Sequence, residues 1–310
     1  MDYRLSTKMI SVKKTAELTG HGNPIFTLEL SQKPGILFTG GNDKGLVEWS
    51  LKTNSFIKVM FRVPASIYAI HCPVKYPYLF AGLRDGNVLA FDFIKQQLIA
   101  PLKHHQKPVF DIKSVAGKQE LLIASEDGTV SIRDLQTLEP VHTLKVSDDT
   151  VRCISISPDE KRVAFGLRNN QIKIYDLDDY SLVKTLHGHT MSVFSVQYAP
   201  ASDYLVSGGR DAQVKIWDGK SFELLYNIPA HLFAVNSIAF HASLPYFATG
   251  SMDKSIKIWG ADDFKLYKVI NREKGFSSHQ LSVNKIAWNG NQLISASDDK
   301  RVLVWDVSFD

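Results

Sequence analysis

The chain repeats itself at a fixed period, and this feature restricts its fold more than any other. Seven segments begin with Asp or Asn, pass through a polar turn and then alternate apolar with polar residues: DKGLVEWS, DGNVLAFD, DGTVSIRD, NNQIKIYD, DAQVKIWD, DKSIKIWG and DKRVLVWD. Their seventh residues lie 42 positions apart five times and then 46 apart: Trp49, Phe91, Arg133, Tyr175, Trp217, Trp259 and Trp305. A spacing held over so many copies indicates a repeat architecture.

Each period reads as a series of short strands. In the fifth period, residues 193–199, 203–209, 213–218 and 222–228 are apolar or alternating runs separated by small or polar turns. Runs of this kind are typical of strands, and none keeps a helical spacing for long. Four strands per 42-residue period, seven times over, predict an all-β fold: a seven-bladed β-propeller of four-stranded antiparallel blades.

Gly-His and Trp-Asp pairs recur within this period and resemble the WD40 repeat. The resemblance covers about residues 12–310 and implies one WD40 propeller domain over residues 1–310. One strand's worth of chain, residues 10–18, precedes the first Gly-His pair, whereas only DVSFD follows Trp305. The resemblance therefore implies that residues 10–18 complete the seventh blade and close the ring. Closure would remove an open sheet edge.

Four repeats carry His, a hydroxyl, Asp and Trp in the same order. His189, Ser207 and Asp211 alone would suggest a catalytic triad, but an active site needs its nucleophile and base once. Four copies favour a repeated hydrogen-bond network among buried polar groups, and the resemblance implies the structural tetrad of WD40 blades. The four sets are His21, Thr39, Asp43 and Trp49; His189, Ser207, Asp211 and Trp217; His231, Thr249, Asp253 and Trp259; and His279, Ser295, Asp299 and Trp305.

Blades two to four depart from this set. The replacements are Val63 and Ala81 in the second blade, Ile123 and Arg133 in the third, and Ser147, Phe165, Asn169 and Tyr175 in the fourth. Either these repeats have drifted, or this arc has been freed for another use. Nothing in the sequence explains why Arg133 stands at the Trp position.

Composition favours a soluble, non-enzymatic, cytoplasmic protein. The chain has 36 basic and 32 acidic residues and only two cysteines, Cys72 and Cys153. It has neither a signal-peptide pattern at its start nor an apolar run of membrane-spanning length. Metal-binding and phosphate-loop motifs are missing. We therefore expect no catalytic, metal-binding or cofactor-binding residues.

The repeat register also predicts which residues surround the channel mouth. In this family the second residue of each innermost strand lies near the mouth: Phe26, Tyr68, Phe110, Arg152, Phe194, Asn236 and Asn284. The residue before each turn acid is expected on the same face: Asn42, Arg84, Glu126, Arg168, Arg210, Met252 and Asp298. These positions differ from blade to blade, which makes them candidates for specificity.

Aromatic and arginine residues gather on one part of this face, as in many binding hot spots. The predicted partner-binding residues are Phe26, Tyr68, Arg84, Phe110, Arg152, Arg168, Phe194 and Arg210. Arginine pairs with carboxylate or phosphate, which favours an interaction scaffold that binds an acidic or phosphorylated peptide segment, with other proteins as partners in a complex. Two alternatives stay open. The aromatic side chains could plug the channel, or they could stack on bases in a nucleic-acid-associated subunit.

Overall fold

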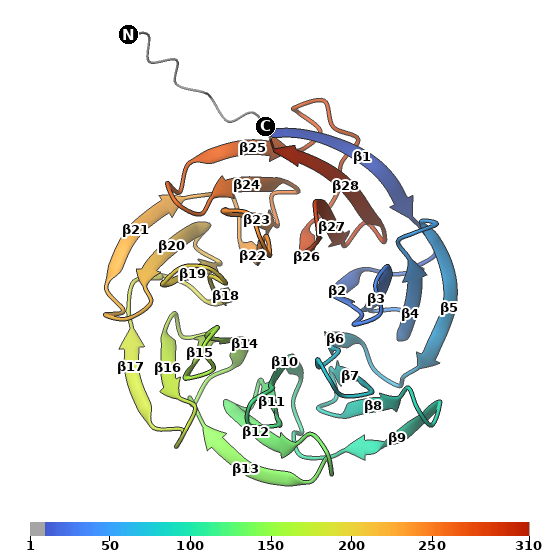
Figure 1. The fold of residues 1–310 in the computed structure, drawn as a ribbon, viewed down its shortest axis with the longest axis vertical. Coiled ribbons are helices and arrows are strands. Elements are labelled where there is room, and N and C mark those ends of the chain that lie inside the picture. The colour runs from blue at the N-terminus through green and yellow to red at the C-terminus, as the bar shows by residue number, and fades with distance from the viewer. Residues whose placement is uncertain (1–9, 310) are drawn as a thin grey trace.

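The computed structural model describes residues 10–309, which form 28 strands and no helix. These strands make seven four-stranded antiparallel sheets, arranged as blades around a central axis (Figure 1). The predicted fold class is confirmed. None of the described secondary structure could cross a bilayer as a helix.

Each blade runs from an innermost strand next to the central axis to an outermost strand at the outer edge of the ring. Blade one comprises β2 (Ile25–Leu30), β3 (Ile36–Gly41), β4 (Gly45–Ser50) and β5 (Ser55–Arg62). Blade two comprises β6 (Ile67–His71), β7 (Tyr78–Leu83), β8 (Val88–Asp92) and β9 (Gln97–Leu102). Blade three comprises β10 (Val109–Val115), β11 (Glu120–Ser125), β12 (Thr129–Asp134) and β13 (Pro140–Lys145).

The remaining blades follow the same order. Blade four comprises β14 (Val151–Ile156), β15 (Arg162–Leu167), β16 (Ile172–Asp176) and β17 (Leu182–Leu186). Blade five comprises β18 (Val193–Tyr198), β19 (Tyr204–Gly209), β20 (Gln213–Asp218) and β21 (Leu224–Pro229). Blade six comprises β22 (Val235–Phe240), β23 (Tyr246–Ser251), β24 (Ile256–Gly260) and β25 (Leu266–Ile270), and blade seven comprises β26 (Val283–Asn289), β27 (Gln292–Ser297), β28 (Val302–Phe309) and β1 (Ile10–Leu18).

The core lies between neighbouring blades. Val214 and Ile216 of blade five, for example, share a buried cluster with Val235 and Phe247 of blade six. Successive residues of a strand point to opposite faces of its sheet. Because both faces of a central strand are covered by neighbouring blades, both sets of residues are buried, which explains why the central strands are apolar almost throughout. The packing of each blade on the next makes the geometry of the whole ring depend on its closure.

Every innermost strand carries an irregularity at the same place. In all seven blades the pairing between the first and second strands shifts at the second residue of the innermost strand, for example between Val193 and Ser195. A bulge leaves its extra residue outside the ladder and re-aims its side chain. The seven bulged residues are the mouth positions predicted from the register: Phe26, Tyr68, Phe110, Arg152, Phe194, Asn236 and Asn284.

The ring closes where the two ends of the chain meet. β1 pairs antiparallel with β28 from Ile10 opposite Phe309 to Leu18 opposite Val302, and it forms the outermost strand of blade seven (Figure 1). Leu18 is buried against blade one as part of a cluster that contains Trp49 and Val302. The strand therefore joins the first blade to the last, as predicted.

Deleting residues 1–19 should sharply lower the melting temperature or cause aggregation, because β28 would lose its partner and become an exposed edge. Scanning calorimetry and light scattering measure both effects. As a control, Glu17→Gln should shift stability by no more than about 1 kcal/mol, since the ion pairs it removes, with Lys14 and Arg301, are both partly exposed. An unchanged melting temperature in the deletion variant would refute the closure account.

Candidate functional site

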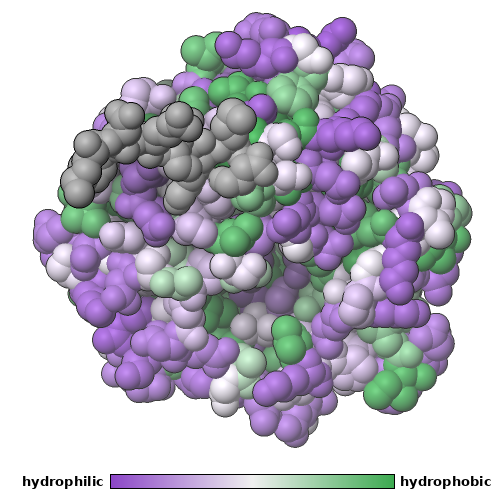
Figure 2. Space-filling model, turned by 45° about the horizontal axis from the view of Figure 1, so that its top comes forward, coloured by the Kyte–Doolittle hydropathy of each residue, from purple (hydrophilic) through white to green (hydrophobic). Residues whose placement is uncertain are grey.

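The central channel contains a candidate binding cavity. Its volume is about 560 Å³, and all seven innermost strands contribute to its lining. The surface is hollowed near the middle of the ring, where the channel opens (Figure 2). The bulged residues surround the end of the channel at which the innermost strands begin.

Arg84, Arg168 and Arg210, the three arginines that precede the turn Asp or Asn and are here called the rim arginines, lie on the same face as the bulged residues. The backbone N–H of the residue before each turn acid bonds to the carbonyl two positions before the bulged residue; Arg210, for instance, donates to Ser192 at 2.8 Å. Equivalent bonds place Arg84 beside Ser66 and Arg168 beside Thr150. All three arginine side chains are exposed and lie outside the cavity lining, whereas Phe26, Tyr68, Phe110, Arg152 and Phe194 form part of that lining.

Five of the predicted residues form a continuous wall from blade one to blade five. The rings of Phe26 and Tyr68 lie 5.3 Å apart edge to face, and Tyr68 stacks on Phe110 at 5.5 Å. The Arg152 guanidinium then lies 5.0 Å from the Phe110 ring and 5.0 Å from the Phe194 ring. We call these five residues the aromatic–arginine wall.

Arg152 lies between two aromatic rings, which attract the cation. Its Nε is buried and has no hydrogen-bond partner within residues 10–309. Burial lowers the pKa of the guanidinium, and the neighbouring charge of Arg168 lowers it further, yet arginine stays charged near neutral pH. Among residues 10–309, no side-chain carboxylate forms an ion pair with this guanidinium.

The other side of the mouth is closed by amide hydrogen bonds. Asn236 Nδ2 donates to Ser282 Oγ and to the Val283 carbonyl, both at 2.9 Å. Asn284 Nδ2 donates to the Ile25 carbonyl at 2.8 Å and to Asp298 at 2.7 Å. These asparagines join blades six, seven and one and use their donors internally. One side of the mouth thus carries asparagine amides whose donors are already hydrogen-bonded within the protein, and the other side carries aromatic rings and a guanidinium.

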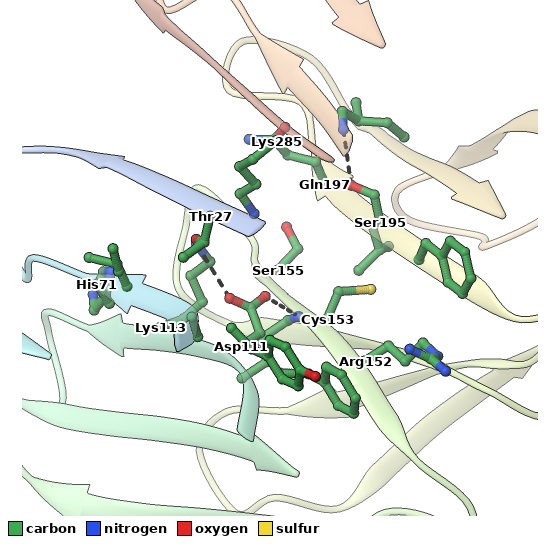
Figure 3. Close-up of a pocket in the computed structure, with 18 of the residues that line it drawn as sticks. Thr27, His71, Asp111, Lys113, Arg152, Cys153, Ser155, Ser195, Gln197 and Lys285 are labelled. Carbon is green, nitrogen blue, oxygen red and sulfur yellow. Dashed lines mark hydrogen bonds and ion pairs between the residues drawn. The ribbon is translucent and has the colours of Figure 1, made fainter. Parts of the chain in front are cut away.

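Charged and polar groups line the channel below the wall (Figure 3). The Asp111 carboxylate accepts the Ile154 backbone N–H at 2.8 Å from the next blade, and Lys113 Nζ lies 3.9 Å from it. Ser195 accepts the Ile238 N–H at 3.1 Å in the same manner. These bonds stabilise the innermost strands against one another.

A hydrogen-bonded Glu–His–Ser set also lines the channel, and the sequence patterns did not predict it. His71 Nδ1 lies 3.2 Å from Glu29 Oε1, and His71 Nε2 lies 2.8 Å from Ser114 Oγ. The members come from blades one, two and three and are 42 and 43 positions apart, so only the alignment of innermost strands could have revealed them. Carboxylate, imidazole and hydroxyl follow one another as they do in a hydrolase triad, but we interpret these contacts as a structural strut, that is, a hydrogen-bonded link between three blades.

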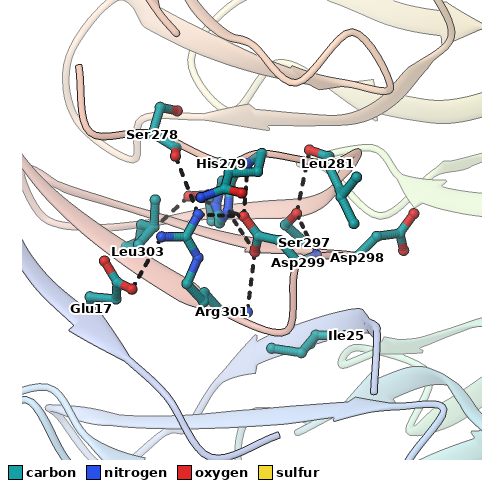
Figure 4. Close-up of polar contacts among 12 residues, drawn as sticks. Glu17, Ile25, Ser278, His279, Leu281, Ser297, Asp298, Asp299, Arg301 and Leu303 are labelled. Atoms are coloured by element: carbon teal, nitrogen blue, oxygen red, sulfur yellow. Dashed lines mark hydrogen bonds and ion pairs between the residues drawn. The ribbon is translucent and has the colours of Figure 1, made fainter. Parts of the chain in front are cut away.

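The four predicted His–hydroxyl–Asp–Trp sets are brought together as continuous hydrogen-bond chains. In blade five His189 contacts Asp211 at 2.9 Å and Ser207 at 2.8 Å, and Trp217 Nε1 donates to Ser207 at 2.9 Å. The equivalent contacts occur in blades one, six and seven. In blade seven Arg301 extends the chain by bonding Asp299 at 2.7 Å and Glu17 of β1 at 3.1 Å (Figure 4).

Blades two to four replace these chains by other means. Val63, Ala81 and Phe91 belong to one apolar cluster that blades one and two share, so apolar packing takes the place of the hydrogen bonds in blade two. In blade four the ring of Tyr175 packs edge to face on Phe165 at 5.6 Å.

Blade three retains a polar chain built from different residues. His105 contacts Asp127 at 2.7 Å and takes its hydroxyl from Ser131 at 2.9 Å, instead of from position 123. Arg133 donates to the Leu138 carbonyl at 2.8 Å and to the Lys103 carbonyl at 2.9 Å. The arginine that the sequence left unexplained thus bonds two backbone carbonyls at the Trp position.

Comparisons with known proteins agree with this repeat structure. Residues 138–176, 180–218, 222–260 and 271–306 match the family model described as WD domain, G-beta repeat. U3 small nucleolar RNA-associated protein 12 of Saccharomyces cerevisiae is 25% identical over 176 residues, which cover 50% of this chain and 18% of that protein. COMPASS component SWD3 of the same yeast is 28% identical over 153 residues, covering 46% of this chain and 45% of that protein. The matched regions span less than half of either relative.

Stability should fall as the pH is lowered from about 5 toward 3. Burial is the largest single influence and opposes ionisation of Asp253, but the hydrogen bond and charge of His231, with the bonds from Ser255 and the Leu232 N–H, together outweigh it and hold the pKa of Asp253 below its usual range. The pKa values of Asp43, Asp127, Asp211 and Asp299 are lowered similarly. Because the unfolded chain then binds more protons than the folded one in this window, acid favours unfolding. Urea denaturation at several pH values measures the slope.

The matched variants are Asp253→Asn and Asp148→Asn, since the Asp148 side chain is fully exposed. Asp253→Asn should flatten the acid limb, whereas Asp148→Asn should leave it unchanged. Equal slopes in both variants would contradict the assigned role of Asp253.

A fluorophosphonate probe should leave Ser114 unmodified, because an activated serine also needs donors placed about 3 Å from the developing oxyanion. The charge of the neighbouring Lys113 is directed to Asp111 instead. Intact-mass spectrometry after treatment, with Ser114→Ala as the control, measures modification. An adduct that depends on Ser114 and His71 would overturn the strut interpretation.

Proposed function

Because this chain belongs to the WD40-repeat family of β-propellers, we propose that it is a non-enzymatic interaction scaffold. It binds an acidic or phosphorylated peptide segment at the channel mouth, on the aromatic–arginine wall. Arg84, Arg168 and Arg210 at the rim attract the same segment. The cytoplasmic location expected from the sequence remains part of this proposal.

Arg152 is the observation that carries the proposal. Its guanidinium is fixed between Phe110 and Phe194, and none of the ion pairs of the described residues involves it. A cation already oriented by packing loses little conformational freedom when an anion binds. Arginine also pairs with a carboxylate or phosphate through two parallel hydrogen bonds. A carboxylate or phosphate therefore suits this position.

The same contacts argue against two other occupants. A cationic side chain from a partner would have to displace Arg152 from between the two rings. The plugging alternative accounts for the ring contacts but gives the Arg152 charge no anionic partner among the described residues. An acidic ligand uses both the cation and its fixed orientation.

A second candidate is an RNA-associated subunit. Aromatic and arginine residues also bind single strands by stacking and charge, and one similar protein is named as small nucleolar RNA-associated. Binding of this kind falls steeply with added salt. The names of both similar proteins fit a subunit of a larger assembly.

Phe194→Ala combined with Arg210→Ala should abolish capture of the main partner in affinity purification, while the melting temperature stays near that of the wild type. The matched control is Phe56→Ala with Arg62→Ala, which removes an exposed aromatic residue and an exposed arginine from β5, the outermost strand of blade one. Normal capture by the mouth variant would refute the site. Capture that disappears after ribonuclease treatment would favour the RNA-associated alternative.

A further inference from the structure

Five apolar side chains stand exposed near the mouth over blades five to seven. They are Met191, Leu232, Phe233, Met252 and Leu281, and between 47% and 83% of each is exposed. We call this group the apolar crescent. Single exposed apolar residues are ordinary, but a group of them on one face marks an interaction site.

The crescent occupies defined repeat positions. Met191, Phe233 and Leu281 each lie two residues after the His of a complete polar chain. At that position the other blades have Asn23, Ala65, Lys107 and Asp149. Large apolar residues are therefore restricted at this position to three neighbouring blades and do not belong to the general repeat pattern.

Backbone hydrogen bonds place the crescent on the mouth face. The Met252 N–H donates to the Ala234 carbonyl at 3.0 Å, next to Phe233. The Arg210 N–H donates to the Ser192 carbonyl at 2.8 Å, next to Met191. Arg210, one of the rim arginines, therefore borders the crescent and links it to the mouth.

The polar chains hold the crescent loops in place. Asp253 Oδ2 accepts the Leu232 N–H at 3.1 Å, and Asp299 Oδ2 accepts the Gln280 N–H at 2.9 Å. In blade five Asp211 accepts the Thr190 N–H at 3.0 Å. Apolar side chains on loops fixed in this way can bind without first paying the cost of ordering those loops.

The exposed charges around the crescent are mainly positive. Arg210, Lys254 and Lys300 are exposed, whereas the turn acids Asp211, Asp253 and Asp299 are bonded to histidines and their side chains are nearly buried. Asp298 is engaged by Asn284 at 2.7 Å. On the longer loop of blade seven, Glu273 stands between Arg272 and Lys274. Charge complementarity therefore favours an apolar segment flanked by carboxylates.

We propose that the apolar crescent anchors the apolar side chains of a short acidic peptide segment of a partner protein. An acidic or phosphorylated residue of the same segment then reaches Arg152 at the mouth, so this inference rests on the proposed function. It adds a second requirement, because a ligand with acid groups alone satisfies the wall but not the crescent. The partner is recognised by mixed apolar and acidic chemistry.

The test uses a fluorescently labelled synthetic peptide that alternates Leu or Phe with Glu and contains one phosphoserine. A matched peptide replaces every Leu and Phe by Ser. Fluorescence polarisation with the full chain measures both affinities. Leu232→Ser with Phe233→Ser should weaken binding of the first peptide by about tenfold or more. The control, Leu224→Ser with Leu225→Ser on β21, should change it by less than about twofold.

Three results separate this inference from the function on which it rests. Wild-type affinity in the crescent variant, or equal binding of the two peptides, would overturn the crescent while leaving the mouth in place. If Arg152→Gln leaves binding unchanged while the crescent variant loses it, the proposed function fails and the crescent survives. If the wild-type chain forms a dimer that the crescent variant abolishes, the occupant is a second copy and the inference is wrong.

Failure to bind the first peptide at about 1 mM would also overturn it. Circular dichroism and melting temperature establish that each variant is folded. The exposed position of Leu232 and Phe233 makes their replacement by Ser compatible with an intact ring.

Discussion

The pairing of β1 with β28 is the interaction on which the rest of the structure depends. Each blade buries its core against its neighbours, so the ring is stable only when the last blade meets the first. The closing strand supplies eight paired positions along β28 and buries Leu18 against blade one. Arg301 adds a polar connection, since it bonds both Glu17 on β1 and Asp299 in the turn before β28. Chain closure and the polar chain of blade seven therefore support each other.

Two features recur around the closed ring, the turn aspartates and the bulges of the innermost strands, and other positions differ from blade to blade. The turn aspartates bond the histidines and also fix the loops that follow them, as Asp253 does for Leu232. The bulges direct one side chain of every blade to the channel mouth. In blades six and seven that side chain is an asparagine that bonds the next blade, whereas in blades one to five it belongs to the aromatic–arginine wall. The repeated frame thus presents different chemistry on opposite sides of one mouth.

Much of this could be predicted from the sequence because it depends on period. The blade number follows from a constant register, whereas the closing strand and the mouth positions were implied by the WD40 resemblance once that register was known. The contacts that could not be predicted either join different blades or arise where one residue of a blade takes the role of another. Ser131 takes over the hydroxyl contact to His105 from a neighbouring strand, and Arg133 finds two backbone carbonyls that no sequence pattern marks. The contact of His71 with Glu29 and Ser114 likewise requires three innermost strands to be aligned. Of the five crescent residues, only Met252 occupies one of the positions expected at the mouth, so the repeat register does not reveal the group.

The central claim is that Arg152, fixed between Phe110 and Phe194, is the anchor for an acidic partner. A crystal structure of this chain with the partner segment recovered by affinity purification tests it most directly. The account predicts a carboxylate or phosphate within hydrogen-bond distance of the Arg152 guanidinium, with the guanidinium still between the two rings. A segment bound at the outer strands, or a mouth left without an anion in that complex, would contradict it.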